Sequence, residues 1–278
     1  MRWGISLPID ASDRAADLLK DFPWVRHVQL KLPASPAERI DDFFARVDAL
    51  RGEIDISLSF HAYPLINFCE SVDAVRAVWH TQALEAMDLA ARCGGDFVVF
   101  HGGYQQTRQF PSRRRAALTL LTQSLTHLLD ESADDGLGIQ LENIYPAPLR
   151  SELIRLMDRA EDYAFLIPRI ENPRFSFCFD YGHAMIDDRG FLIQDLVMSR
   201  VGSLHLHENN HLEDTHHPIG GAVSPYNWPR ELARLRKRAF NGPVIFENPP
   251  DQLFAALEFA AHFVNESLDL PHLPSRVD

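Results

Sequence analysis

The chain has 278 residues, of which 46% are hydrophobic and 24% charged, and its formal net charge is −12. This balance is typical of a folded globular protein and excludes an intrinsically disordered chain. No apolar run approaches the length of a membrane-spanning helix, and the N-terminal residues resemble a strand rather than a signal peptide. The three cysteines lack metal-binding spacing and fit a reducing compartment, so we expect a cytoplasmic protein without a membrane partner.

Short apolar segments separated by polar residues predict eight strands. Most of these segments are nearly continuous apolar runs, as expected for strands that are buried on both faces of a parallel sheet. In chain order, the predicted strands are Trp3–Leu7, Val25–Leu32, Ile54–His61, Phe97–His101, Gly138–Glu142, Phe175–Asp180, Val201–His207 and Val244–Glu247.

A helical pattern follows each predicted strand. Several patterns begin at a serine, which favours a helix N-terminus, and the third ends at Gly94-Gly95, which favours a helix C-terminus. The polar residues from Pro271 to Asp278 are expected to fray. In chain order, the predicted helices are Ser12–Lys20, Ser35–Leu50, Ser71–Cys93, Ser112–Ser132, Ser151–Tyr163, Phe191–Met198, Trp228–Arg238 and Pro250–Asn265.

Eight alternations of strand and helix predict an α/β fold, a (β/α)₈ TIM barrel that forms a single domain over residues 1–278. A doubly wound sheet is the alternative, and it requires a glycine-rich phosphate-binding turn after an early strand. The turn after the first predicted strand is Pro8-Ile9-Asp10, which lacks that motif. No internal repeat or linker indicates a second domain.

Potential metal ligands follow the predicted strands at one end. The carboxyl ends of the strands form the active-site mouth of such a barrel. Imidazole and carboxylate suit Zn, Mn, Fe or Co, and carboxylates crowded in a water-poor mouth repel one another unless cations offset their charge. We therefore predict a site for divalent metal ions. The residues at the strand ends are His61, His101, Glu142, Asp180 with His183 one turn later, His205 and Glu247.

The loop after the seventh predicted strand is rich in histidine and carboxylate. Asp214 and His216 form a D-x-H pair, which places two ligands within reach of one ion. Gly220 and Gly221 then allow close approach of the backbone to a ligand. A solvated polar loop is the alternative, and strand alternation directs His207 outward.

Taken together, these motifs resemble those of the xylose-isomerase-like TIM-barrel superfamily. The family contains sugar and sugar-phosphate isomerases and epimerases, and also nucleases of the endonuclease IV type (AP endonuclease family 2). His61–Asn67 is similar to its H-A-P-Y-L-I-N segment with two residues transposed. The other similar segments are Phe100–Gly103, Leu141–Asn143, Asp180–His183, His205–Asn209, Asp214–His216 and Glu247–Pro249.

The resemblance implies one of two metal sites, with one to three ions per chain. In the isomerase and epimerase branch, one ion is held by four residues, and the two glutamates also shuttle a proton; here these correspond to Glu142, Asp180, His205 and Glu247. In the nuclease branch, nine residues hold three ions. The matching residues are His61, His101, Glu142, Asp180, His183, His205, Asp214, His216 and Glu247.

The complete set of nine favours a multinuclear nuclease site, but other features favour an isomerase. The first predicted strand ends without a histidine, and the second is followed by the short segment Lys31–Ala34. A net charge of −12 gives no broad field for phosphates, although bound cations offset part of it. Arg113–Arg115 is expected on a solvated helix face. We therefore predict a sugar or sugar-phosphate isomerase or epimerase, with an apurinic-site phosphodiesterase as the alternative.

The expected partner is a small sugar-like molecule, and nucleic acid only under the nuclease alternative. Glu208 is expected as a rim carboxylate, and Trp228 either stacks on a sugar or packs in the core. A non-catalytic sugar- or metal-binding barrel and an iron oxidase remain further classes, and the sequence leaves the oligomeric state open. The predicted substrate-binding residues are Lys31, Tyr104, Asn143, His207 and Trp228.

Overall fold

A computed structural model describes residues 1–34, 40–53, 55–106, 112–132, 136–148, 151–187, 189–220 and 226–265. Within these residues, eight parallel strands close into a barrel in the order β1-β10-β9-β8-β6-β4-β3-β2. The predicted (β/α)₈ barrel is therefore confirmed. The barrel strands are β1 (Arg2–Pro8), β2 (Val25–Lys31), β3 (Ser57–His61), β4 (Phe97–His101), β6 (Gly138–Glu142), β8 (Phe175–Asp180), β9 (Val201–Leu206) and β10 (Pro243–Phe246).

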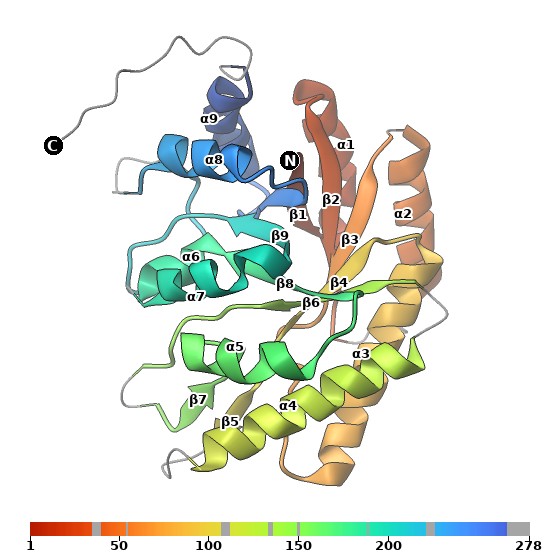
Figure 1. Ribbon diagram of the computed structural model, residues 1–278. Coiled ribbons are helices and arrows are strands. Elements are labelled where there is room, and N and C mark those ends of the chain that lie inside the picture. The colour runs from red at the N-terminus through yellow and green to blue at the C-terminus, as the bar shows by residue number, and fades with distance from the viewer. Residues whose placement is uncertain are drawn as a thin grey trace, which may run out of the picture.

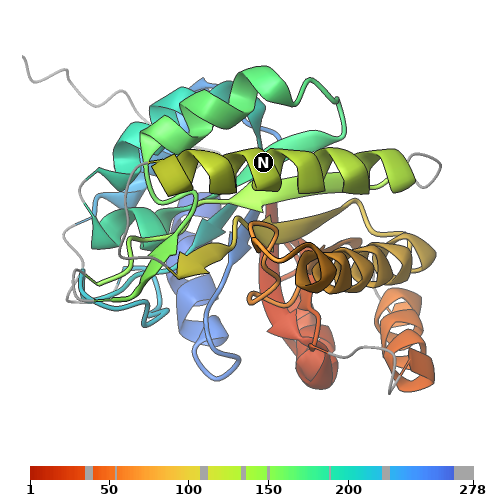
Figure 2. The same cartoon turned by 90° about the horizontal axis from the view of Figure 1, so that it is seen from below.

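Helices surround the strands on the outside of the barrel (Figures 1 and 2). The short 3₁₀ turns are η1 (Ile9–Ala11), η4 (Ile167–Arg169) and η5 (Met198–Arg200). In the described part of the chain, no helix is both long enough and apolar enough to cross a membrane. The α-helices are α1 (Ser12–Asp21), α2 (Ile40–Glu53), α3 (Asp73–Arg92), α4 (Ser112–Glu131), α5 (Ala160–Leu166), α6 (Tyr181–Ile186), α7 (Gly190–Val197), α8 (Trp228–Lys237) and α9 (Leu253–Asn265).

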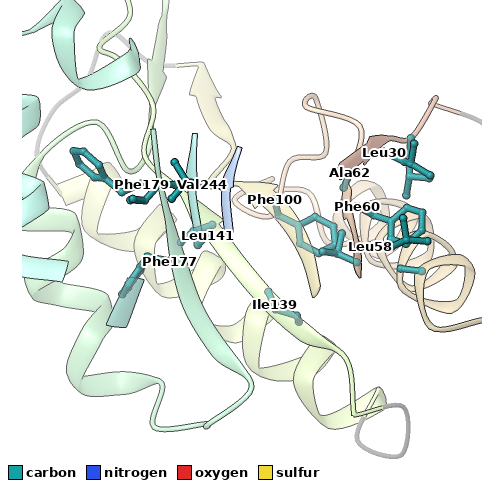
Figure 3. Close-up of a cluster of buried hydrophobic side chains, with 14 of the residues drawn as sticks. Leu30, Leu58, Phe60, Ala62, Phe100, Ile139, Leu141, Phe177, Phe179 and Val244 are labelled. Carbon is teal, nitrogen blue, oxygen red and sulfur yellow. The ribbon is translucent and has the colours of Figure 1, made fainter. Parts of the chain in front are cut away.

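Alternation along each strand divides its side chains between the helical layer and the barrel interior. On β8, Phe177 packs against Tyr163 of α5, with ring centroids 5.2 Å apart. Figure 3 shows Phe177 and Phe179 in a cluster of buried apolar side chains that also come from β2, β3, β4, β6 and β10. Cys178 and Asp180 therefore face the interior, and Cys178 packs there in a second, smaller apolar cluster.

The strand register brings the polar strand ends to one level. His101 of β4 pairs with Glu142 of β6, and Asp180 of β8 pairs with His205 of β9. Lys31 of β2 likewise pairs with His61 of β3. Because all these strands are parallel, the residues share the carboxyl end of the barrel, which is the end that carries the active site in this fold.

The predicted helix Ser151–Tyr163 is wrong. Leu153–Arg155 forms a strand, β7, which pairs antiparallel with β5 (Tyr104–Gln106), and the helix α5 starts only at Ala160. The carboxylate of Asp162 accepts a hydrogen bond from the backbone N–H of Met157, whose φ is +70°, and this contact holds the turn between strand and helix.

Other boundaries differ less. Helix α6 was not predicted and begins directly after Asp180, whose carboxylate caps it by accepting a hydrogen bond from the N–H of His183. Strand β9 ends at Leu206, one residue before the predicted end. The predicted helix start at Ser35, Gly221 and the polar tail from residue 271 lie outside the described residues.

Candidate active site

A cavity of about 200 Å³ opens at the carboxyl ends of the strands. Seven of the nine predicted metal ligands line it, together with Lys31. The other two, Asp180 and His205, lie beneath with no exposed surface. The lining residues are Lys31, Leu32, His61, Ala62, Pro64, His101, Glu142, His183, Asp214, His216 and Glu247.

Four buried side chains converge at the centre of this cavity. Nδ1 of His205 lies 3.0 Å from Oε1 of Glu142 and 2.8 Å from Oε2 of Glu247. The same nitrogen lies 3.6 Å from Oδ2 of Asp180. Each of the four offers one ligand atom, and these atoms all lie within 4.8 Å of one another. The structure thus brings together the four residues that the resemblance implies for a single ion.

Two further groups adjoin the first. Glu142 also contacts two histidines, since its Oε2 lies 2.9 Å from Nε2 of His61 and 3.2 Å from Nε2 of His101. On the other side, His183 and His216 each place Nε2 3.2 Å from Oδ2 of Asp214. All nine predicted ligands therefore lie in one connected cluster.

The histidines are oriented as metal ligands are. Nδ1 of His61 donates to the carbonyl of Ala62, and Nδ1 of His183 donates to the carbonyl of Asn143. Nδ1 of His216 donates to the carbonyl of Glu247. In each case the bond from Nδ1 directs Nε2 toward the cluster, where it can bind an ion once it has lost its own proton, and this arrangement orients and tunes a metal-binding histidine.

Asp214 supplies a second sign of a cation. Its Oδ1 is buried and has no hydrogen-bond partner among the described residues. An unpaired buried carboxylate oxygen is costly unless a positive charge compensates it. The donor set of imidazoles and carboxylates therefore fits a divalent ion such as Zn, Mn, Fe or Co.

The electrostatics agree with this fit. Burial opposes the charge of Glu142, but protonated His205 and hydrogen bonds from neighbouring histidines outweigh it and hold the pKa of Glu142 well below its usual range. For Glu247, burial is likewise outweighed, by Lys31 and His205, and its pKa is also low. Burial opposes the charge of His183 as well, yet Asp180 and Asp214 raise its pKa well above the usual value. Positive charge on protonated histidines thus offsets the negative charge of the carboxylates, as a bound metal ion would.

Asn143 was predicted to contact substrate, but its amide is used inside the protein. Its Nδ2 donates to the carbonyl of Asp180 at 2.9 Å, and its Oδ1 accepts from the N–H of Asp180 at 2.7 Å. These two bonds fix the backbone that carries the Asp180 carboxylate. Asn143 is therefore a support for a candidate ligand.

Lys31 and Tyr104 differ in their access to the cavity. Nζ of Lys31 lies 2.8 Å from Oε1 of Glu247, and the side chain lines the cavity. Tyr104 is half-buried on β5, where its N–H donates to Oδ1 of Asn67, and it is not among the lining residues. The structure thus keeps Lys31 beside the candidate ligands and leaves Tyr104 at a distance from them.

The predicted role of Trp228 in sugar stacking is corrected to core packing. Trp228 is 1% exposed, and its ring lies 5.4 Å from that of Tyr181. Its Nε1 donates to Oε1 of Glu208, which also accepts from the N–H of Gly220. Glu208 is therefore a buried acceptor and not the expected rim carboxylate, because the two side chains satisfy each other in the core.

Two residues near the cluster were missed. Cys178 offers its sulfur within 4.8 Å of ligand atoms of Glu142 and His205, and burial raises the pKa of this thiol to about 11, which keeps it protonated. The alternation Cys178–Asp180 on one strand was a usable signal.

The second missed residue is Tyr145. Its ring lies 5.3 Å from that of His183, and the guanidinium of Arg155 lies over its face. No sequence signal marked Tyr145, because β7 was not predicted.

Comparison with known proteins now identifies the family. Residues 14–263 match the family described as xylose isomerase-like TIM barrel. The chain belongs to this family. No curated protein matches the chain.

Several solved structures share the fold at low sequence identity. A D-tagatose 3-epimerase-like protein is 19% identical with a TM-score of 0.76, and the match covers 97% of this chain and 100% of that one. A putative xylose isomerase from Rhodospirillum rubrum is 18% identical, with a TM-score of 0.77 and coverage of 93% and 97%. Endonuclease IV from Thermus thermophilus is also 18% identical, with a TM-score of 0.69 and coverage of 96% and 100%. The fold is thus common to epimerases, isomerases and a nuclease, and it does not by itself select one activity.

Proposed function

We propose that the protein is a metal-dependent isomerase or epimerase that acts on a sugar or a sugar phosphate. The observation that carries the proposal is the convergence of Glu142, Asp180, His205 and Glu247 on one point in the cavity. Glu142 ends β6 and Glu247 directly follows β10, and both approach Nδ1 of His205. A substrate bound above His205 therefore has a carboxylate within reach on either side.

The chemistry assigns a role to each group. A divalent ion, when bound, acts as a Lewis acid on the carbonyl and hydroxyl oxygens of an open-chain sugar. Glu142 or Glu247 removes a proton from the carbon next to the carbonyl, and a carboxylate returns it to the same or the adjacent carbon. The low pKa values of both glutamates keep them ionised, which is the state that a general base requires before it takes a proton. Lys31 donates to Glu247 and to a substrate oxygen at the cavity wall.

The size of the cavity supports a small substrate. Its volume of about 200 Å³ is below the range of about 300–1,000 Å³ that is typical of sites for drug-sized ligands. Among the solved structures with this fold are proteins named D-psicose 3-epimerase and D-allulose 3-epimerase, one of them determined in the presence of D-fructose. A sugar-sized molecule is therefore the partner that we expect.

A phosphodiesterase of the endonuclease IV type is the second candidate. The adjoining groups His61–His101–Glu142 and His183–Asp214–His216 favour it, because clustered ions can generate hydroxide and stabilise a phosphodiester. Lys31 is the single Lys or Arg among the residues that line the cavity, and this sparse positive charge favours the sugar substrate.

The test measures metal content and proton exchange together. The purified protein is analysed for Zn, Mn, Fe and Co and incubated with a panel of ketoses, aldoses and their phosphates in D₂O. We expect deuterium to enter the carbon next to the carbonyl, as seen by NMR, and Glu247→Gln to abolish this exchange. Glu213→Gln removes an exposed carboxylate from the neighbouring loop and serves as the matched control. Cleavage of abasic DNA without exchange into any sugar would overturn the proposal in favour of the nuclease.

A further inference from the structure

His207 is a buried histidine of the mouth to which the proposed function gives no role. It follows β9 directly, has no exposed surface and does not line the cavity. The expected outward direction and the predicted contact with substrate are therefore wrong, because His207 points to the same side of the strand as His205, two residues earlier. Its Nε2 lies 3.1 Å from Oδ1 of Asp180 and 3.2 Å from Oδ2 of the same carboxylate. The carboxylate of Asp214 is farther away, at 3.7 Å from the same nitrogen. His207 therefore contacts both oxygens of Asp180.

The stacking of His207 on His216 separates it from the other histidines of the cluster. The two ring centroids are 3.9 Å apart, and the planes are inclined by only 12°. The lone pair of an imidazole nitrogen lies in the plane of the ring, and a bound ion sits on that line at about 2.0–2.1 Å. Two stacked, nearly parallel rings do not direct their lone pairs to a common point. Although His207, Asp214 and His216 each offer a ligand atom within 4.8 Å of the others, the parallel stacking of the two rings argues against an ion shared by His207 and His216.

The absence of a side chain at Gly182 leaves space for the His207 ring. A Cβ built on Gly182 would lie 1.9 Å from Cε1 of the His207 ring, far inside van der Waals contact. Gly182 belongs to α6 and lies between Asp180 and His183 in sequence. The imidazole is therefore held on its face by His216, at its edge by Gly182 and at Nε2 by Asp180.

We propose that His207 is a positioning residue that donates its Nε2 proton to Asp180 and fixes this carboxylate for metal binding, and that Gly182 provides the space this requires. An ionised carboxylate only accepts hydrogen bonds, so in the absence of an ion this contact places a proton on Nε2, as it does for the other histidines that face carboxylates. What sets His207 apart is its ring, which is stacked on that of His216 and lies against Gly182. Outer partners of this kind orient and tune a metal ligand. The role rests on the proposed function, in that it assumes an ion at Asp180.

The test is a titration with Mn²⁺, in which calorimetry gives the affinity and electron paramagnetic resonance gives the number of bound ions. We expect His207→Ala to keep the number of ions and to weaken the affinity by about 10–100-fold. His207→Gln restores much of this loss, because the amide nitrogen of glutamine can donate from a similar position. His217→Gln, at an exposed histidine of the neighbouring loop, is the matched control and leaves the titration unchanged.

A double-variant cycle links Gly182 to His207. Gly182→Ala displaces the imidazole and weakens Mn²⁺ binding to an extent similar to His207→Ala. In the His207→Ala background the added methyl group meets no ring, so Gly182→Ala costs little further affinity. Such non-additivity is the signature of two residues that act through one contact.

Five outcomes would overturn the proposal. Loss of a bound ion in His207→Ala would make His207 a ligand, and unchanged affinity in that variant would reduce it to packing. Fully additive effects of the two substitutions would separate Gly182 from His207. If thermal unfolding shows that His207→Ala does not fold, His207→Gln becomes the test. A folded His207→Gln with no affinity for Mn²⁺ would then contradict the proposal, because the amide nitrogen of glutamine should replace the donor. A wild-type chain that binds no Mn²⁺, Zn²⁺, Fe²⁺ or Co²⁺ would instead overturn the proposed function, and this role with it.

Discussion

Glu142 is the side chain at which the candidate ligand groups meet. Its Oε2 faces His61 and His101, and its Oε1 faces His205. The side chain has no exposed surface, so its charge is not hydrated and depends on positive partners. Glu142 would therefore belong to both proposed ligand groups, and its removal would affect both.

Glu142→Gln tests this dependence. The amide keeps the size of the side chain but removes the charge and one acceptor, so the surrounding histidines lose their common anion. We expect the affinity for the first divalent ion to fall by at least about 100-fold, since a direct ligand should matter no less than its outer partners. Titration with Zn²⁺ or Mn²⁺ measures the change, with Glu213→Gln as control. Wild-type affinity in Glu142→Gln would remove Glu142 from the metal site.

Sequence predicted the positions of the candidate ligands, because each follows an apolar strand and parallel strands end at the same edge. It could not predict which polar side chains form hydrogen bonds within the protein and are therefore not free to bind a substrate. Glu208 and Trp228 lie 20 positions apart in sequence, and only the folded loop brings Nε1 of Trp228 to the carboxylate. The paired bonds between Asn143 and the Asp180 backbone likewise depend on two neighbouring strands of the barrel. Burial of such pairs is a tertiary property that local patterns do not carry.

The small sheet of β5 and β7 shows the corresponding limit for elements. Each strand has three residues, which is too short for a periodic pattern, and their pairing joins segments that flank α4 and β6. The long barrel strands, by contrast, were predicted to within a few residues, because their buried runs are bounded by turn residues. Arg114 of α4 holds the segment after β7 through Asp158 and Asp162.

The run Arg113–Arg115 was expected on a solvated face, and for Arg114 this is wrong. Its Nε donates to Oδ1 of Asp162 at 2.7 Å, and the carboxylates of Asp158 and Asp162 are 4% and 1% exposed. Arg114→Met leaves the carboxylate of Asp162 buried without its cation and leaves Asp158 with Arg159 alone. We expect the free energy of unfolding to fall by about 3–5 kcal/mol, as measured by urea denaturation.

Arg113→Met is the matched control for this experiment, because Arg113 is exposed in the first turn of the same helix. Its effect on the free energy of unfolding should stay within about 0.5 kcal/mol. Equal effects of the two substitutions would mean that the Arg114 ion pairs are solvated and contribute nothing specific.

At the scale of the whole molecule, the net charge of −12 is concentrated in part at the barrel mouth. There, carboxylates from β6, β8 and the segments after β9 and β10 surround histidines that they keep protonated. For His205, burial opposes the charge, yet the ionised Glu247 and Glu142 raise the pKa well above the usual value. For His216, burial is outweighed by Asp214 and Glu247, and the pKa is also raised. Without metal, histidines at the barrel mouth thus carry protons at positions where the holoprotein would bind ions.

Metal binding should therefore release protons, and metal-linked stability should depend on pH. Because the pKa values of His183 and His205 are raised well above the usual value and that of His216 is also raised, these groups keep their protons to higher pH than a free imidazole and must lose them before they can ligate. The affinity for metal then rises as pH increases and falls as pH decreases.

The measurement compares unfolding temperatures. An ion at 100 times its dissociation constant stabilises the fold by about 2.7 kcal/mol. At a fixed Zn²⁺ concentration, the unfolding temperature should therefore exceed that of the chelated protein by less at about pH 6 than at about pH 8. Calorimetry in buffers of different ionisation enthalpy counts the released protons, and a metal-induced shift that is equal at both pH values, with no proton release, would contradict the protonated state of the cluster.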